Sequence, residues 1–111
     1  MDKEEILIKS GKEYFYSGED EFHKGRYNSA VVLYFKALLS FSDLYVLYKT
    51  GNTPSSHNDR FRITKEKFSE VYDLLDKDFP FYQSSYVQLM NKELAEIIKD
   101  KERQMREAAN R

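Results

Sequence analysis

The sequence has 111 residues, enough for one domain with a hydrophobic core of its own. It contains no cysteine, which excludes disulfide bridges, thiolate metal sites and a cysteine nucleophile. Basic and acidic residues nearly balance at a net charge of −1, so no overall charge points to nucleic acid or to a membrane surface.

The first residues are charged from position 2 onward and contain no apolar signal core. The apolar uncharged run from Tyr27 to Phe35 is far shorter than the roughly 20 residues that span a bilayer. We therefore expect a soluble, cytoplasmic protein. No residue pattern calls for a cofactor or a metal ion.

Residues 2–24 have the pattern of a first helix, with acidic residues at its start that suit the positive end of the helix dipole. Gly11 and Gly18 lie on its inner line, together with Leu7, Tyr14 and Phe22. Because glycine is unfavourable in a helix by up to about 1 kcal/mol, this placement predicts the close approach of a neighbouring helix, with a hinge as the alternative. Gly25 predicts a very short connection to the next helix.

The second helix, from Tyr27 to about Thr50, has apolar side chains around nearly its whole circumference. One broad stripe consists of Tyr27, Ala30, Val31, Tyr34, Ala37, Leu38, Phe41, Leu44, Tyr45 and Tyr48. Much of the remaining surface is filled by Val32, Leu33, Phe35, Leu39, Val46 and Leu47, which leaves a narrow polar lane of Ser29, Lys36, Ser40 and Asp43. A helix of this kind is usually buried, and a small domain is not expected to surround it alone. We therefore expect a homodimer formed through this helix.

Residues 51–59 are rich in turn-forming types, and Ser55 or Ser56 is expected to cap a third helix with a break near residues 65–68. Pro80 predicts a bend or boundary. The last helix lies between Gln83 and the C-terminus, with an apolar face of Tyr86, Leu89, Met90, Leu94, Ile97 and Ile98, and Asn91 offers an alternative start. Residues 101–111 are charged all round, and we expect a solvated or frayed tail. The sequence thus predicts one all-α domain over residues 1–111, an antiparallel up-and-down bundle of four or five helices.

Several features between Phe22 and Leu75 resemble one known family. They are the second helix with Ala30, Lys36, Ala37 and Leu38, the Gly51-x-x-Pro54-x-x-His57 connection, and the Arg60–Phe61 pair that follows. In these features the chain resembles the short prokaryotic members of the HEPN family, the higher eukaryotes and prokaryotes nucleotide-binding domain. The resemblance implies a helical bundle, commonly a homodimer and often encoded beside a small nucleotidyltransferase protein, in a toxin–antitoxin or defence setting. It also implies nucleotide or RNA as the class of ligand.

The HEPN proteins that cleave RNA carry an arginine followed, after four to six residues, by a histidine. Neither histidine of this chain meets that spacing, because residues 50–52 precede His57 and residues 16–18 precede His23 without an arginine. The resemblance therefore implies a fold and a class of partner without the ribonuclease activity. A divergent ribonuclease built on Arg60, His57 and Asp43 is the alternative from the enzyme class.

Polar residues that could bind a ligand come from two segments. Lys36 and Asp43 lie about 10 Å apart along the polar lane of the second helix. His57, Arg60 and Arg62 stand where the third helix begins, and free backbone amides at a helix start favour an anion. We expect Asp43 and Arg60 to pair, Lys36 to lie further along the same groove, and an anion to bind near His57 and Arg60.

Two structural interpretations compete with this site. In the first, the polar lane is the solvent-exposed edge of the second helix. In the second, His57 and Asp59 cap the third helix while the arginines pair with nearby carboxylates. A third function, a structural adaptor, is suggested because GRYNSAVVLYFKAL is similar to one tetratricopeptide helix junction, although no second repeat follows. The sequence favours a non-catalytic HEPN-type module that binds a nucleotide, an RNA or a nucleotidyltransferase partner.

Overall fold

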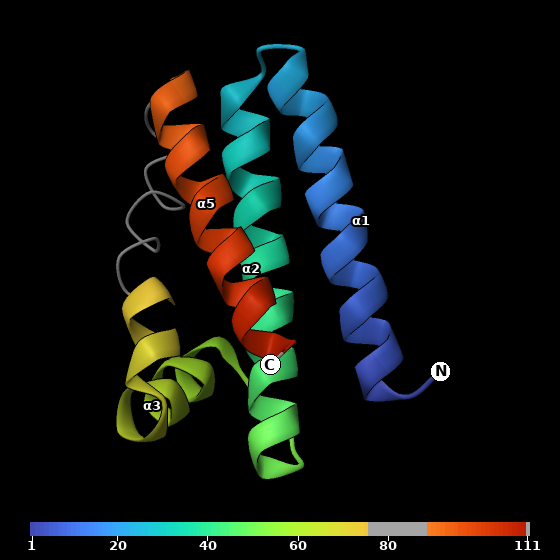
Figure 1. Cartoon of the computed structure of the whole chain (residues 1–111), viewed down its shortest axis with the longest axis vertical. Coiled ribbons are helices and arrows are strands. Elements are labelled where there is room, and N and C mark those ends of the chain that lie inside the picture. The colour runs from blue at the N-terminus through green and yellow to red at the C-terminus, as the bar shows by residue number, and fades with distance from the viewer. Residues whose placement is uncertain (76–88, 111) are drawn as a thin grey trace.

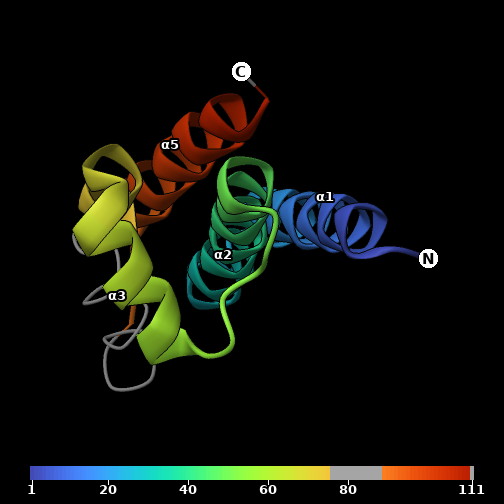
Figure 2. The ribbon, with the colours of Figure 1, turned by 90° about the horizontal axis from the view of Figure 1, so that it is seen from below.

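A computed structural model describes residues 1–75 and 89–110, and all regular structure within them is helical. The helices are α1 (Lys3–His23), α2 (Tyr27–Thr50), α3 (His57–Lys67) and α5 (Lys92–Ala109), and residues 69–75 are helical as well. Figures 1 and 2 show α2 in the centre, with α1 on one side and α5 and α3 around the rest. The predicted all-α bundle is confirmed for these residues. The predicted bend at Pro80 and the residue Tyr86 lie outside them.

α1 begins where its acidic start predicts, because the Asp2 side chain accepts a hydrogen bond of 2.9 Å from the Glu5 backbone amide. Its two inner glycines permit the close approach of α2. A Cβ atom at Gly11 would lie 2.7 Å from Phe41 Cζ, and one at Gly18 would lie 2.9 Å from the Tyr34 ring. The chain then turns back at Gly25, whose φ of 76° lies in the left-handed region that glycine tolerates. Close helix packing, rather than a hinge, explains the glycines of α1.

α2 is enclosed by its own chain more completely than the sequence predicts. Phe35 is fully buried and Val46 is 1% exposed, although both belong to the spare apolar surface, the part of α2 that was expected to contact a second copy of the chain. The expectation of spare apolar surface at these two residues is wrong, because helices on both sides of α2 each cover part of it (Figure 2). The other four residues of that surface are only half-buried: Val32, Leu33, Leu39 and Leu47.

By length and composition alone, α2 qualifies as a helix able to cross a membrane, which the count of unbroken uncharged residues did not indicate. In its most apolar window, however, 61% of the residues are buried inside the fold. A core helix meets the same criterion, since it is apolar for the sake of its neighbours.

The caps and the break predicted for the second half of the chain are present. The Ser56 side chain accepts from the Asp59 amide at the start of α3, which ends at Lys67 next to Phe68. Asn91 caps α5 by accepting from the Leu94 amide at 2.9 Å. Leu89 therefore precedes the helix and is 89% exposed, which contradicts its predicted place on an apolar helix face.

The predicted solvated tail is wrong for residues 101–109, which continue α5. Met105 and Ala109 are buried against α2 and its neighbours, on the same side as Ile98. The inward-facing side of this segment is hard to recognise in the sequence, because one of its positions is Glu102, a charged residue that is fully buried. An ion pair between Glu102 and Arg106 makes that burial tolerable.

Candidate functional site

The predicted pairing of Asp43 with Arg60 is confirmed. Arg60 donates from Nε to one Asp43 carboxylate oxygen at 2.7 Å and from Nη2 to the other at 3.0 Å. The two side chains are 14% and 15% exposed, so this bidentate pair is largely withdrawn from water. It joins the C-terminal half of α2 to the first turn of α3.

His57 completes what we call the α2–α3 cluster, which consists of Asp43, His57 and Arg60. Arg60 Nη1 lies 2.7 Å from His57 Nδ1, so all three guanidinium nitrogens have partners. The His57 ring also packs edge-on against Phe61, with ring centroids 5.0 Å apart. Burial, and then the charge of Arg60, lower the pKa of His57, while Asp43 opposes this effect.

This lowered pKa gives a testable pH dependence. Because the unfolded chain binds a proton at His57 at a higher pH than the folded chain does, the neutral imidazole favours folding. The contribution is fully present above about pH 6.5, the ordinary value, and is lost as the pH falls through the lower folded pKa. Urea unfolding of the wild type and of His57→Gln between neutral and mildly acidic pH measures it. We expect the slope of stability against pH to be smaller in the variant, and equal slopes would contradict the assignment.

The other two predicted site residues are not joined to this cluster. Arg62 is 58% exposed and pairs with Asp59 at 2.6 Å and with Glu66 at 3.4 Å on the surface of α3. Lys36 lies 5.8 Å from the ring centroid of Tyr14, on α1, and forms no ion pair within the described residues. Of the five predicted residues, the structure therefore brings together Asp43, His57 and Arg60. The place of Lys36 further along a ligand groove stays a prediction.

The α2–α3 cluster has the chemistry of a structural junction. Arg60 is neutralised by Asp43, and three of its five N–H donors are engaged within the cluster. The binding of an anion near His57 and Arg60 stays a prediction. Among the described residues, no group of three or more His, Asp or Glu side chains is arranged to hold a metal ion.

A second polar cluster, which sequence reasoning missed, lies between α1 and α5. Lys99 contacts Glu19 at 2.8 Å, and Glu19 also accepts a hydrogen bond of 2.6 Å from the Tyr34 hydroxyl. Burial raises the pKa of Glu19, but the hydrogen bonds from Lys99 and Tyr34, together with the charges of Lys99 and His23, outweigh it, and the net effect is a lowered pKa. The sequence contains one sign of polar contacts on the inner side of α5: Glu102 interrupts the apolar positions between Ile98 and Met105.

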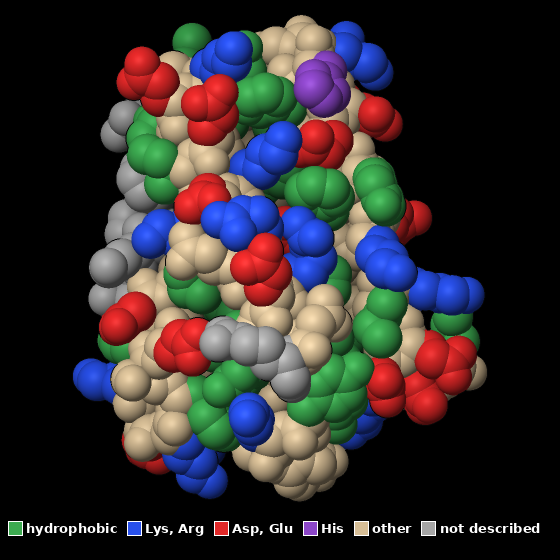
Figure 3. All heavy atoms as spheres, viewed as in Figure 1, with side chains coloured by type: hydrophobic (Ala, Val, Ile, Leu, Met, Phe, Trp, Pro, Cys, Tyr) green, Lys and Arg blue, Asp and Glu red, His purple; other side chains and the backbone are tan. Residues whose placement is uncertain are grey.

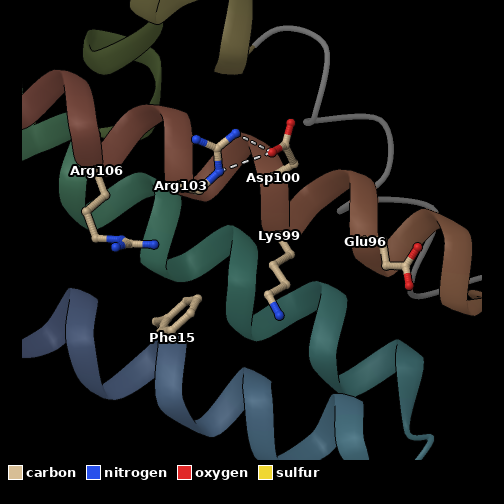
Figure 4. Close-up of a pocket in the computed structure, with 6 residues that line it drawn as sticks. All are labelled: Phe15, Glu96, Lys99, Asp100, Arg103 and Arg106. Carbon is tan, nitrogen blue, oxygen red and sulfur yellow. Dashed lines mark hydrogen bonds and ion pairs between the residues drawn. The ribbon is translucent and has the colours of Figure 1, made fainter.

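Next to these ion pairs is a cavity of about 240 Å³, which we call the α1–α5 pocket. Figure 4 shows the side chains that line it: Phe15, Glu96, Lys99, Asp100, Arg103 and Arg106. The side chains of Lys99 and Arg106 extend from α5 toward α1, and the Phe15 ring points from α1 toward them. Arg103 turns instead to Asp100, at 2.6 Å.

No family model, curated protein or solved structure matches this chain. The resemblance to the HEPN family therefore stays a prediction from the motifs.

Proposed function

We propose that this chain is a non-catalytic, HEPN-type binding module of the cytoplasm, built as an antiparallel up-and-down bundle. Its partner is a nucleotide, an RNA or a small nucleotidyltransferase protein, in a toxin–antitoxin or defence setting. The observation that supports a non-catalytic role is the engagement of Arg60. An arginine that must stabilise a scissile phosphate needs an available charge, whereas Asp43 neutralises Arg60, and three of the five N–H donors of Arg60 bind Asp43 and His57.

The experiment that tests this proposal has two arms. The tagged chain, recovered from its native cell extract, should carry a nucleotidyltransferase-type protein, a nucleotide or RNA, identified by mass spectrometry and nuclease treatment. The purified chain should leave single-stranded RNA intact. Recovery of the chain alone would contradict the binding role. Cleavage abolished by His57→Ala would instead establish the divergent ribonuclease, which the proximity of His57, Arg60 and Asp43 favours as the second candidate.

We further infer that the module is a homodimer through α2. The supporting observation is that Val32 of this core helix is only half-buried and, among the described residues, belongs to neither hydrophobic core cluster. Leu33, the next residue along α2, is half-buried as well. A surface of this kind on a core helix favours contact with a second copy.

The dimer is tested by light scattering or sedimentation at micromolar concentration, where we expect twice the mass of the chain. Val32→Lys should give a folded monomer, because the substitution places a charge in the dimer interface and leaves the buried core residues unchanged. Ile6→Lys is the matched control: Ile6 is 47% exposed on α1, and its replacement should leave the dimer intact. A wild-type chain that is monomeric throughout this range would end the proposal.

A further inference from the structure

One core position of α5 is occupied by a carboxylate. Glu102 is fully buried, in line with Ile98 and Met105 on the inner side of α5. Burial raises its pKa, against the effect of Arg106. An apolar side chain at such a position is often as stabilising as a buried ion pair or more so, so stability alone does not explain a glutamate there.

Glu102 orients Arg106. It accepts hydrogen bonds from Arg106 Nε at 3.0 Å and from Nη2 at 3.2 Å. The Arg106 guanidinium carbon lies 5.0 Å from the centroid of the Phe15 ring, which holds the other side of the group. The remaining nitrogen, Nη1, donates to no group in the described residues, and the side chain is 35% exposed.

Lys99 is held in a similar way. Its ammonium contacts Glu19 at 2.8 Å, while the Tyr34 hydroxyl donates to the same carboxylate and fixes it. One ion pair leaves donor capacity on an ammonium group, which has three N–H bonds. Lys99 is 37% exposed and Glu19 is 21% exposed, so the cation is the more accessible member of the pair.

The two cations therefore form an accessible layer above less accessible carboxylates. Arg106 is 35% exposed over a fully buried Glu102, and Lys99 is the outer member of its own pair. Figure 3 shows Lys and Arg side chains midway along the face that α1 and α5 share, with Asp and Glu side chains between them. Within the two ion pairs, the donors of Lys99 and Arg106 are nearer to solvent than the carboxylates of Glu19 and Glu102.

The shape and chemistry of the α1–α5 pocket select a small, phosphorylated ligand. Its volume of about 240 Å³ is below the usual range for drug-sized ligands, about 300–1,000 Å³. Arginine binds phosphate oxygens directionally and lysine binds them as a point charge, and the Phe15 ring provides an apolar wall.

We propose that the α1–α5 pocket binds the phosphate group of a small phosphate monoester, such as a mononucleotide, through Lys99 and Arg106. Glu19 and Glu102 are positioning residues that act through these two cations. The choice of a nucleotide rests on the function proposed above, but the phosphate site itself rests on the pocket.

The test is an NMR titration of the isotope-labelled full chain with inorganic phosphate, adenosine monophosphate and adenosine, at constant ionic strength. We expect phosphate and adenosine monophosphate to shift the amide signals around Lys99 and Arg106, and adenosine alone to shift none of them. Shifts confined to the α3 start, around His57 and Arg62, would overturn this inference and leave the proposed function standing. No shift anywhere would overturn both the pocket and nucleotide binding.

Variants separate positioning from folding. Arg106→Gln should weaken binding of adenosine monophosphate about tenfold, the effect of losing one charge-assisted hydrogen bond. Glu102→Leu should weaken it similarly with the free energy of unfolding unchanged or increased, because leucine suits the core while Arg106 loses its orientation. Lys92→Gln is the control: it removes a charge of the same sign from the exposed start of the same helix, and Lys92 does not line the pocket. Equal weakening by Lys92→Gln and Arg106→Gln would show general charge attraction and overturn the site.

Discussion

Replacing Asp43 with alanine should lower the free energy of unfolding by about 3 kcal/mol, because the variant leaves the Arg60 guanidinium largely buried without its carboxylate partner. The pair joins α2 to α3, so α3 should loosen before the rest of the bundle. Urea unfolding followed by circular dichroism measures the loss, and hydrogen exchange of the α3 amides locates it.

The control for this change is Arg62→Ala on the neighbouring turn of α3. Arg62 also forms two ion pairs, but its side chain is 58% exposed, and surface pairs contribute little. If Asp43→Ala costs no more than Arg62→Ala, the buried pair is not a structural junction.

Replacing Gly11 with valine should cost about 3 kcal/mol, at the upper end of the usual range for overpacking a core. A Cβ atom at this position would lie 2.7 Å from Phe41 Cζ, and Phe41 is 3% exposed in the main core, which leaves its ring little room to move away. The loss should appear even though valine has a better intrinsic helix propensity than glycine, by a few tenths of a kcal/mol.

Thermal unfolding of Gly11→Val, Gly11→Ala and Lys12→Ala checks this prediction. Lys12 is the next residue along α1 and is exposed, so its replacement should leave stability nearly unchanged. Gly11→Ala should fall between the other two. A stabilising effect of alanine at position 11 would show that α1 moves away from α2 without cost.

Local signals in the sequence predicted where most of the described helices begin. A cap depends on a side chain and an amide three residues further on, so Asp2 was readable as a helix start, Ser56 as one of two candidates and Asn91 as the alternative start of the last helix. The pairing of Asp43 with Arg60 was also predictable, since a short connection after Thr50 can bring the α3 start back only to the C-terminal half of α2.

The candidate site was predicted less completely. The sequence placed Arg62 beside Arg60, but the helix rotation of α3 points Arg60 to α2 and leaves Arg62 with Asp59 on the surface. It also assigned Lys36 to a ligand groove, which stays a prediction; the Lys36 ammonium lies 5.8 Å from the Tyr14 ring centroid. A rotation of this kind depends on how the whole apolar face packs, and residue spacing within one helix does not reveal it.

The sequence by itself determined that the described residues are helical, where α1, α2 and α3 begin, and which glycines face a neighbour. Each of these follows from interactions within a few residues, or from the period of apolar residues along one helix. Only the tertiary structure decided that Phe35 lies in the core, that Glu102 is buried beneath Arg106, and that Lys99 reaches Glu19. Those contacts depend on which faces of α1, α2 and α5 meet, and that choice is made by the packing of all their side chains together.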